Sequence, residues 1–175
     1  IGNVAFYNCT GLTGELVIPN NVAEIGANAF EGCSALTSVT IGDGVKSIRD
    51  SAFNNCRSLT SISFGENSQL TRIGEKTFGG CSSLTSITIP DSVTSIGKSA
   101  FYNCSSLAGI TIPDNVTSIG KSAFKACRSL TSVTIGNGVK NIGDSAFSGC
   151  SLLAGIIIPD SVTSIGASAF FECSG

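Results

Sequence analysis

A phenylalanine followed three residues later by a cysteine recurs along the whole chain at a nearly constant interval. The cysteines are Cys9, Cys33, Cys56, Cys81, Cys104, Cys127, Cys150 and Cys173. The phenylalanines are Phe6, Phe30, Phe53, Phe78, Phe101, Phe124, Phe147 and Phe170. Successive cysteines are 24, 23, 25, 23, 23, 23 and 23 residues apart. A period of this length predicts a solenoid, in which each repeat forms one coil that packs on its neighbours.

The apolar residues between these landmarks follow one pattern in every copy. Residues 100–120 fit A-F-x-x-C-x-x-L-x-x-I-x-I-P-x-x-V-x-x-I-G, which contains the leucine-rich-repeat strand signature L-x-x-I-x-I. Seven copies of this signature are present, from Leu12 to Leu153. One extra residue before Leu16 accounts for the interval of 24. Two extra residues within 66–69 account for the interval of 25, and they predict a bulged turn between Phe64 and Leu70.

This pattern resembles the BspA-like class of leucine-rich repeats, which is named after a bacterial surface antigen. The hallmark of the class is I-P-x-x-V-x-x-I-G-x-x-A-F-x-x-C-x-x-L, and the match covers essentially all 175 residues. Relatives occur in surface and secreted proteins of bacteria and of some parasitic protists. The resemblance implies a right-handed coil, a secreted or cell-surface location and a role in adhesion or recognition. It names no ligand.

Local patterns predict how each coil is built. Thr85 to Ile89 alternates polar and apolar residues, which is typical of a half-buried strand that Pro90 ends. We expect seven such strands to form a parallel sheet about 30 Å long on the concave face. On the return path, Gly97 is expected to supply a backbone angle closed to other residues. The segment 100–104 is expected to form a short helical turn on the convex face.

The whole chain, residues 1–175, is expected to be a single array of about seven repeats. One repeat cannot fold alone, because its few inward side chains do not offset the entropy lost on ordering 23 residues. Neither end shows the polar capping segment that solenoids usually need. We therefore expect a piece of a longer array, and the alternative is self-association through the end coils.

The outward strand positions predict a flat, hydroxyl-rich surface with almost no charge. Leucine-rich-repeat proteins commonly bind partners on this concave face. The candidate binding residues are Ser38, Thr40, Ser61, Ser63, Ser86, Thr88, Thr111, Ser132 and Thr134. Regular threonine rows also suggest ice binding, but Ser63 and Ile157 break the rows and a curved sheet fits a flat ice plane poorly.

Reactive chemistry is sparse. The chain has no histidine, which excludes common hydrolase triads and argues against an enzyme. The cysteines lack the short spacing of zinc ligands. We expect them, with the phenylalanines, to form a buried ladder of free thiols, although stacked neighbours would also lie within disulfide range. Asp43, Asp91, Asp114 and Asp160 follow the strands and are expected to cap turns, with a weak calcium column as the alternative. No cofactor is expected.

Charge and hydropathy exclude two kinds of partner. Charged residues make up 13% of the chain and the net charge is −2, so no nucleic-acid partner is expected. No apolar stretch approaches 18 residues, so no membrane insertion is expected. The cations outside the turns are expected to lie on a solvated face: Arg49, Arg57, Lys76, Lys98, Lys121 and Arg128. Tyr7, Tyr102 and Phe171 occupy one exposed slot. Asn8, Asn103 and Asn115 begin sequons that either carry glycans or simply suit turns.

These observations predict a non-catalytic extracellular module that binds a protein or glycan partner in adhesion. The alternative is a structural solenoid that assembles end to end or side by side with further copies of itself.

Overall fold

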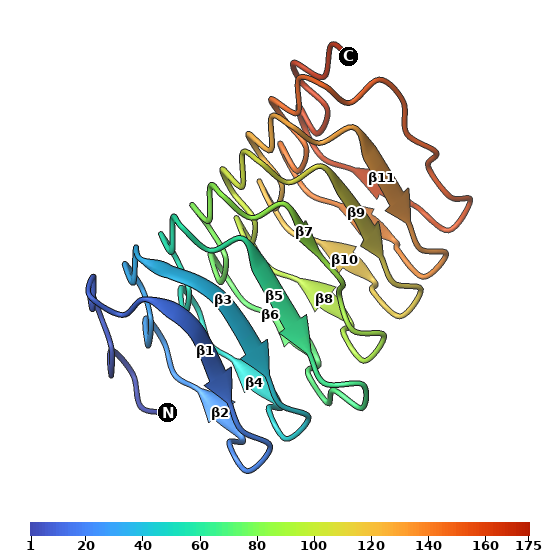
Figure 1. Ribbon diagram of the computed structural model, residues 1–175. Coiled ribbons are helices and arrows are strands. Elements are labelled where there is room, and N and C mark those ends of the chain that lie inside the picture. The colour runs from blue at the N-terminus through green and yellow to red at the C-terminus, as the bar shows by residue number, and fades with distance from the viewer.

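The computed structural model describes all residues, 1–175, as an elongated stack of coils with the two termini at opposite ends (Figure 1). Each internal coil contributes a first strand, a second strand of two residues and a run of turns, and there is no helix. The first strand is the longer one, with four to six residues, except at Ser86–Ile87, where it also has two. Neighbouring strands come from consecutive coils and run parallel. The solenoid predicted from the period is therefore confirmed.

The longer strands lie side by side on one surface, which we call the long-strand face (Figure 1). They are β1 (Gly14–Ile18), β3 (Leu36–Ile41), β5 (Ser61–Phe64), β7 (Ser86–Ile87), β9 (Gly109–Ile112) and β11 (Ser132–Ile135). They form two separate sheets, β1-β3-β5-β7 and β9-β11. The expectation of seven strands in one sheet is wrong, because the segment 153–158 forms no strand and the sheet is interrupted between β7 and β9.

The interruptions coincide with a change in sequence. Most copies read Leu-Thr-Ser where the strand begins, and the threonine hydroxyl donates to a carbonyl of the preceding coil, as Thr60 Oγ1 does to Thr37 O over 3.0 Å. The two copies that lose pairing with the preceding strand read Leu-Ala-Gly instead, at 107–109 and 153–155. Alanine removes the hydroxyl bond and glycine weakens a strand, so the substitution loosens the coil at this edge.

The second strands of the coils, each of two residues, form one continuous seven-stranded sheet on a second side of the coil. They are β2 (Glu24–Ile25), β4 (Ser47–Ile48), β6 (Arg72–Ile73), β8 (Ser95–Ile96), β10 (Ser118–Ile119), β12 (Asn141–Ile142) and β13 (Ser164–Ile165). In internal coils the isoleucine of each pair is buried and the residue before it is more exposed. This sheet follows the coil order without a break, unlike the long-strand face.

The third side consists of turns, and the helical turn expected at 100–104 is wrong. The N–H groups of Ser99, Phe101 and Asn103 donate to carbonyls of the next coil over 2.9, 2.7 and 2.8 Å. The N–H groups of the residues between them donate to the carbonyl three residues earlier and so close four-residue turns within the coil. Ser99 and Asn103 have φ values of 53° and 57°. Left-handed residues at both positions prevent a helix and aim alternate N–H groups at the neighbouring coil.

Gly97 acts differently from the expectation as well. The φ of Gly97 is not positive. Apart from that of Gly14, the positive φ values fall two residues before each repeat phenylalanine and one residue before each cysteine. A Cβ on Gly97 would lie 2.7 Å from the carbonyl carbon of Gly74 in the preceding coil. The missing side chain therefore allows two coil backbones to approach closely.

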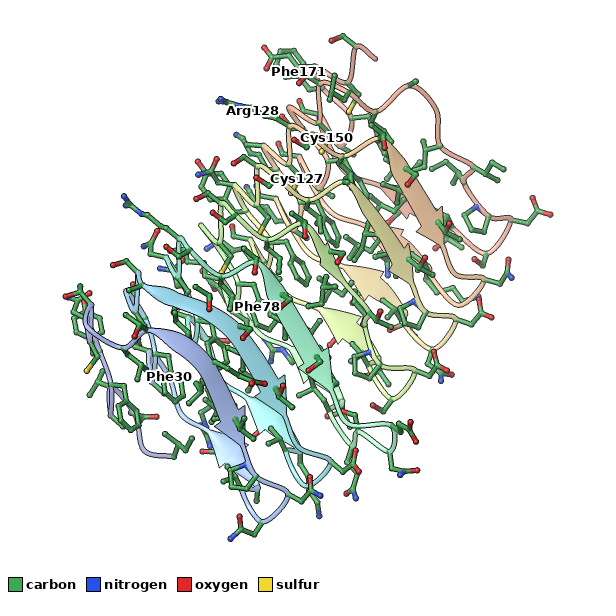
Figure 2. The ribbon with its side chains drawn as sticks, viewed as in Figure 1. Phe30, Phe78, Cys127, Arg128, Cys150 and Phe171 are labelled. Carbon is green, nitrogen blue, oxygen red and sulfur yellow. The ribbon has the colours of Figure 1, made fainter.

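A column of stacked phenylalanine rings runs through the core. Neighbouring ring centroids lie 5.0 to 5.8 Å apart. The planes of Phe101 and Phe124 differ by 4°, whereas those of Phe78 and Phe101 differ by 26°. The most tilted pair adjoins the coil that carries the two extra residues, where Ser68 N–H donates to Gly65 O over 3.1 Å and closes the turn. Figure 2 labels Phe30 and Phe78 between the two strand layers.

Candidate functional site

The long-strand face carries the candidate binding residues. They alternate with inward residues of the core: Ser61 and Ser63 are exposed, whereas Ile62 between them is 6% exposed. The pairing places equivalent residues side by side, for example Ser38 beside Ser61 and Thr111 beside Thr134. The structure thus brings the nine candidates together along one surface, in two rows.

Most hydroxyls of this face have no partner within the protein. Thr40 Oγ1 donates to the Glu15 carboxylate over 2.9 Å and lies 3.1 Å from Ser63 Oγ. The hydroxyls of the other seven candidates make no hydrogen bond within the chain. A hydroxyl can donate one hydrogen bond and accept two, so these side chains are free to bind an incoming polar ligand.

A hollow of about 480 Å³ lies where the sheet is interrupted. Its lining includes Thr88, Thr111, Ser132 and Thr134, together with Gly109, which has no side chain. A second hollow of about 460 Å³ adjoins it and is lined by Ser63, Phe64, Glu66, Asp91 and Ser92, among others. The sequence interpretation missed these hollows, although the change from Thr-Ser to Ala-Gly at 108–109 was a usable signal.

The cysteines form a regular column beside the phenylalanine rings. Each thiol after the first donates to the carbonyl of a phenylalanine in the preceding coil, and Cys104 Sγ lies 3.1 Å from Phe78 O. All eight cysteines are free, and the six of the internal coils are buried. The expected burial is wrong for Cys9, which is exposed, and for Cys173, which is half-buried, because each lies in an end coil that is covered on one side only. Burial raises the pKa of the Cys81 and Cys150 thiols to about 12, and it raises that of Cys104 well above its usual value. Neutral, buried thiols of this kind are poor nucleophiles and poor metal ligands.

The turn acids act between coils. Asp43 Oδ1 accepts the N–H of Asn67 over 2.9 Å, and Asp114 Oδ1 accepts that of Asn137 over 2.7 Å. These two carboxylates therefore cap the corner of the following coil. No three His, Cys, Asp or Glu side chains lie close enough together to hold a metal ion.

The exposed cations fall into two groups. The paired group comprises Arg49 with Glu24 at 2.9 Å, Lys98 with Glu75 at 3.0 Å and Lys121 with Asp144 at 3.9 Å. The hydrogen bond from Arg49 lowers the pKa of Glu24, and it raises that of Arg49 itself. The second group, which includes Arg57 and Arg128, makes no ion pair.

The sequon asparagines and the three aromatic residues of the exposed slot differ in how far they are accessible. Asn8 and Asn115 are exposed, although the Asn115 side chain already donates to Asp91 O over 2.7 Å. Asn103 is half-buried beside the buried Cys104. Tyr7, Tyr102 and Phe171 are 49%, 45% and 58% exposed. No helix of the structure could cross a membrane.

Comparison with known proteins identifies the repeat. The family model described as BspA type Leucine rich repeat region (6 copies) matches residues 1–127 and 64–175. No curated protein matches the chain.

Solved structures of leucine-rich repeat proteins are similar to this one. A Bacteroides ovatus protein is 36% identical with a TM-score of 0.85, and the match covers 91% of this chain and 43% of the other. A T. pallidum protein is 34% identical with a TM-score of 0.86, covering 91% of this chain and 76% of the other. A leucine rich cell surface protein of Faecalibacterium prausnitzii is 32% identical with a TM-score of 0.58, and the match covers 97% of this chain and 61% of the other.

The chain thus spans less than half the length of the Bacteroides ovatus protein. The family match, in contrast, extends from the first residue to the last. The period, the stacked phenylalanines and the column of thiols agree with it. The chain belongs to the BspA-type leucine-rich repeat family.

Proposed function

We propose that the chain is a non-catalytic binding module of a secreted or cell-surface protein, which holds a protein or glycan partner against the long-strand face in adhesion. The observation that carries the proposal is the row of unpartnered hydroxyls around the hollow at the sheet interruption. The family supports a surface location, as does the similar cell surface protein of Faecalibacterium prausnitzii.

The chemistry of this face suits recognition rather than reaction. Thr88, Thr111, Ser132 and Thr134 offer donors and acceptors on a rigid scaffold, so little conformational entropy is lost when a partner binds. The chain contains no histidine that could activate these hydroxyls as nucleophiles. The half-buried ring of Phe64 in the adjoining hollow adds an apolar surface against which a partner can pack.

The test is a binding screen with a blocking variant. The chain is screened against immobilised extracellular-matrix proteins and a glycan array. Thr111→Arg fills the hollow, and Thr71→Arg is the matched control, because Thr71 is exposed on the second side and its hydroxyl also makes no hydrogen bond. We expect Thr111→Arg to weaken binding at least roughly tenfold and Thr71→Arg to leave it unchanged. Full binding by Thr111→Arg would refute the proposal.

A second candidate function is end-to-end assembly of copies into a longer solenoid. On the turn side each coil donates N–H groups to the coil that follows it, but those of Ser168, Phe170 and Glu172 have no acceptor in the chain. A following coil, of the same chain or of a second copy, would supply the acceptors. Sedimentation velocity over a wide concentration range tests this candidate, and a strictly monomeric mass at the highest concentration contradicts it.

A further inference from the structure

The corner between the turn side and the long-strand face differs most among otherwise similar copies. We call it the Phe–Cys corner, and it is formed by the residue after each phenylalanine and the residue after each cysteine. The residues after phenylalanine are Tyr7, Glu31, Asn54, Gly79, Tyr102, Lys125, Ser148 and Phe171. Those after cysteine are Thr10, Ser34, Arg57, Ser82, Ser105, Arg128, Ser151 and Ser174. Both tyrosines and two of the four arginines of the chain lie here.

A hollow of about 510 Å³ crosses this corner. Tyr102, Lys125 and Arg128 lie at one end of it, and Glu172 lies at the other. Between them, Ser148, Gly149 and Ser151 occupy the slots that Lys125, Ala126 and Arg128 fill one coil earlier. The hollow exists because one coil carries small residues where its neighbour carries long ones. Figure 2 shows Arg128 and Phe171 on the same edge of the stack.

The charges around this hollow are not balanced within the protein. Lys125 and Arg128 are exposed and make no ion pair, unlike Arg49, Lys98 and Lys121. Glu172 is the one acidic residue of the lining. A guanidinium binds a carboxylate through two parallel N–H bonds, so an unpaired Arg128 favours a carboxylate partner.

The residue types are those that dominate the energy of protein interfaces. Tyrosine and arginine are enriched at positions where truncation strongly weakens binding. Tyr102 and Arg128 line the same hollow, whereas the long-strand face carries neither type. The hollow spans four coils, about 16 Å at the spacing of the stacked rings. An extended peptide of about five residues has this length.

We propose that the Phe–Cys corner from Tyr102 to Glu172 is a docking site for an acidic segment of a partner protein. Carboxylates of the segment bind Arg128 and Lys125, and its side chains pack on the Tyr102 ring. The inference rests on the proposed function as a binding module, but it places a contact on a different surface. The small residues at 148–151 leave room for the peptide backbone.

The test is an NMR titration of the ¹⁵N-labelled chain at low ionic strength. The probe is a ten-residue peptide with four glutamates, and the control peptide carries glutamines in their place. We expect the glutamate peptide to shift the amide signals of Ser148, Gly149 and Ser151. We expect Lys125→Ser with Arg128→Ser, which copies the slots of the next coil, to weaken binding roughly tenfold.

Two further variants sharpen the test. Arg72→Ser with Lys140→Ser removes the same charge from exposed sites on the second side, and we expect less than about a twofold change. Glu172→Gln removes the repelling carboxylate, and we expect roughly twofold tighter binding. An equal loss in both double variants would overturn the proposal, as would equal shifts with the glutamine peptide or no shifts at 148–151.

The outcomes also separate this inference from the proposed function. Peptide shifts confined to Thr111 and Ser132 would support the long-strand face and overturn the corner site. Shifts at Ser148 to Ser151 with a carboxylated oligosaccharide, but not with the peptide, would overturn the assignment to a protein segment. If Thr111→Arg loses matrix or glycan binding while the acidic peptide fails to bind the corner, the proposed function stands and only the corner site is overturned.

Discussion

Replacing Ala108 by Thr and Gly109 by Ser should join the two sheets of the long-strand face. These substitutions restore the Leu-Thr-Ser sequence of the paired copies. The new threonine hydroxyl would donate to Thr85 O, as Thr131 Oγ1 donates to Ala108 O over 3.1 Å one coil later. Strand β9 would then pair with β7 as well as with β11.

The gain in stability follows from two contributions. A hydroxyl-to-carbonyl hydrogen bond contributes about 0.5–1.5 kcal/mol, and replacing a glycine within a strand contributes about 0.5–1 kcal/mol. A Cβ on Gly109 would lie 2.8 Å from Ser132 Oγ, a side-chain atom that can rotate away at small cost. We expect the free energy of unfolding to rise by about 1–2 kcal/mol, which raises Tm on the order of 4 °C for a chain of this length.

Urea unfolding measures the stability, and hydrogen exchange locates the change. We expect slower exchange of the Ile110 and Thr111 amides in the double variant. The matched reverse change, Thr131→Ala with Ser132→Gly, should separate β9 from β11 and lower the free energy of unfolding by a similar amount. Unchanged exchange in the first variant, or intact pairing in the second, would refute the reasoning that Leu-Ala-Gly causes the interruption.

Three further predictions concern the core and the turns. Thr77 stands where most copies have alanine, and its buried hydroxyl has no hydrogen-bond partner. Thr77→Val should therefore raise the free energy of unfolding by about 1–2 kcal/mol. A lower free energy of unfolding in urea would show that the hydroxyl is satisfied. Ala126 has a φ of 62° and Gly149, in the same position one coil later, has a φ of 74°. Ala126→Gly should therefore stabilise the chain by about 0.5–1 kcal/mol, and Gly149→Ala should destabilise it by a similar amount. Changes of the same sign in urea unfolding would contradict this prediction. Burial raises the pKa of Cys81 and Cys150 in the folded state from 9.0 to about 12. The stability that these neutral thiols contribute is therefore complete below pH 9 and is lost as the pH rises toward 12. The loss is about 1.4 kcal/mol per pH unit for each thiol. An unchanged urea midpoint between pH 8 and pH 10 would disprove the last prediction.

The architecture can be predicted from the sequence because the period shows which residues occupy equivalent positions in successive coils. Once Phe101 and Phe124 are known to be equivalent, stacking of coils places their rings in contact, at 5.1 Å. The alternation around Ile87 likewise predicts which side chains face the core. These features depend on residue type and spacing alone, so the sequence is sufficient for them.

Features that depend on the distance between coils could not be predicted in this way. The period does not show how closely Gly97 approaches Gly74, so the sequence alone predicts a special backbone angle at this glycine. The turns at 100–104 resemble a helix in sequence because Phe101 and Cys104 are three residues apart and both buried. Only the positive φ of Ser99 and Asn103 shows that the N–H groups turn toward the next coil.

The candidate sites were predictable in part. The outward row that includes Thr111 follows from alternation, but the hollow beside it depends on a lost strand pairing. The sequence predicts that Arg128 lies on a solvated face, but it does not show that Arg128, unlike Arg49, makes no ion pair. The hollow at the sheet interruption and the hollow of the Phe–Cys corner both lie where one copy differs in sequence from its neighbours.

The stacked phenylalanines make the length of this protein adjustable in steps. Neighbouring rings are about 5 Å apart, and the hydrogen bonds between coils join residues about one period apart. Loss or duplication of one repeat-coding segment would therefore remove or add one rise of about 5 Å and leave the other coils as they are. Recombination between near-identical copies can thus change the length of the array in steps of one coil without redesigning the coils that remain.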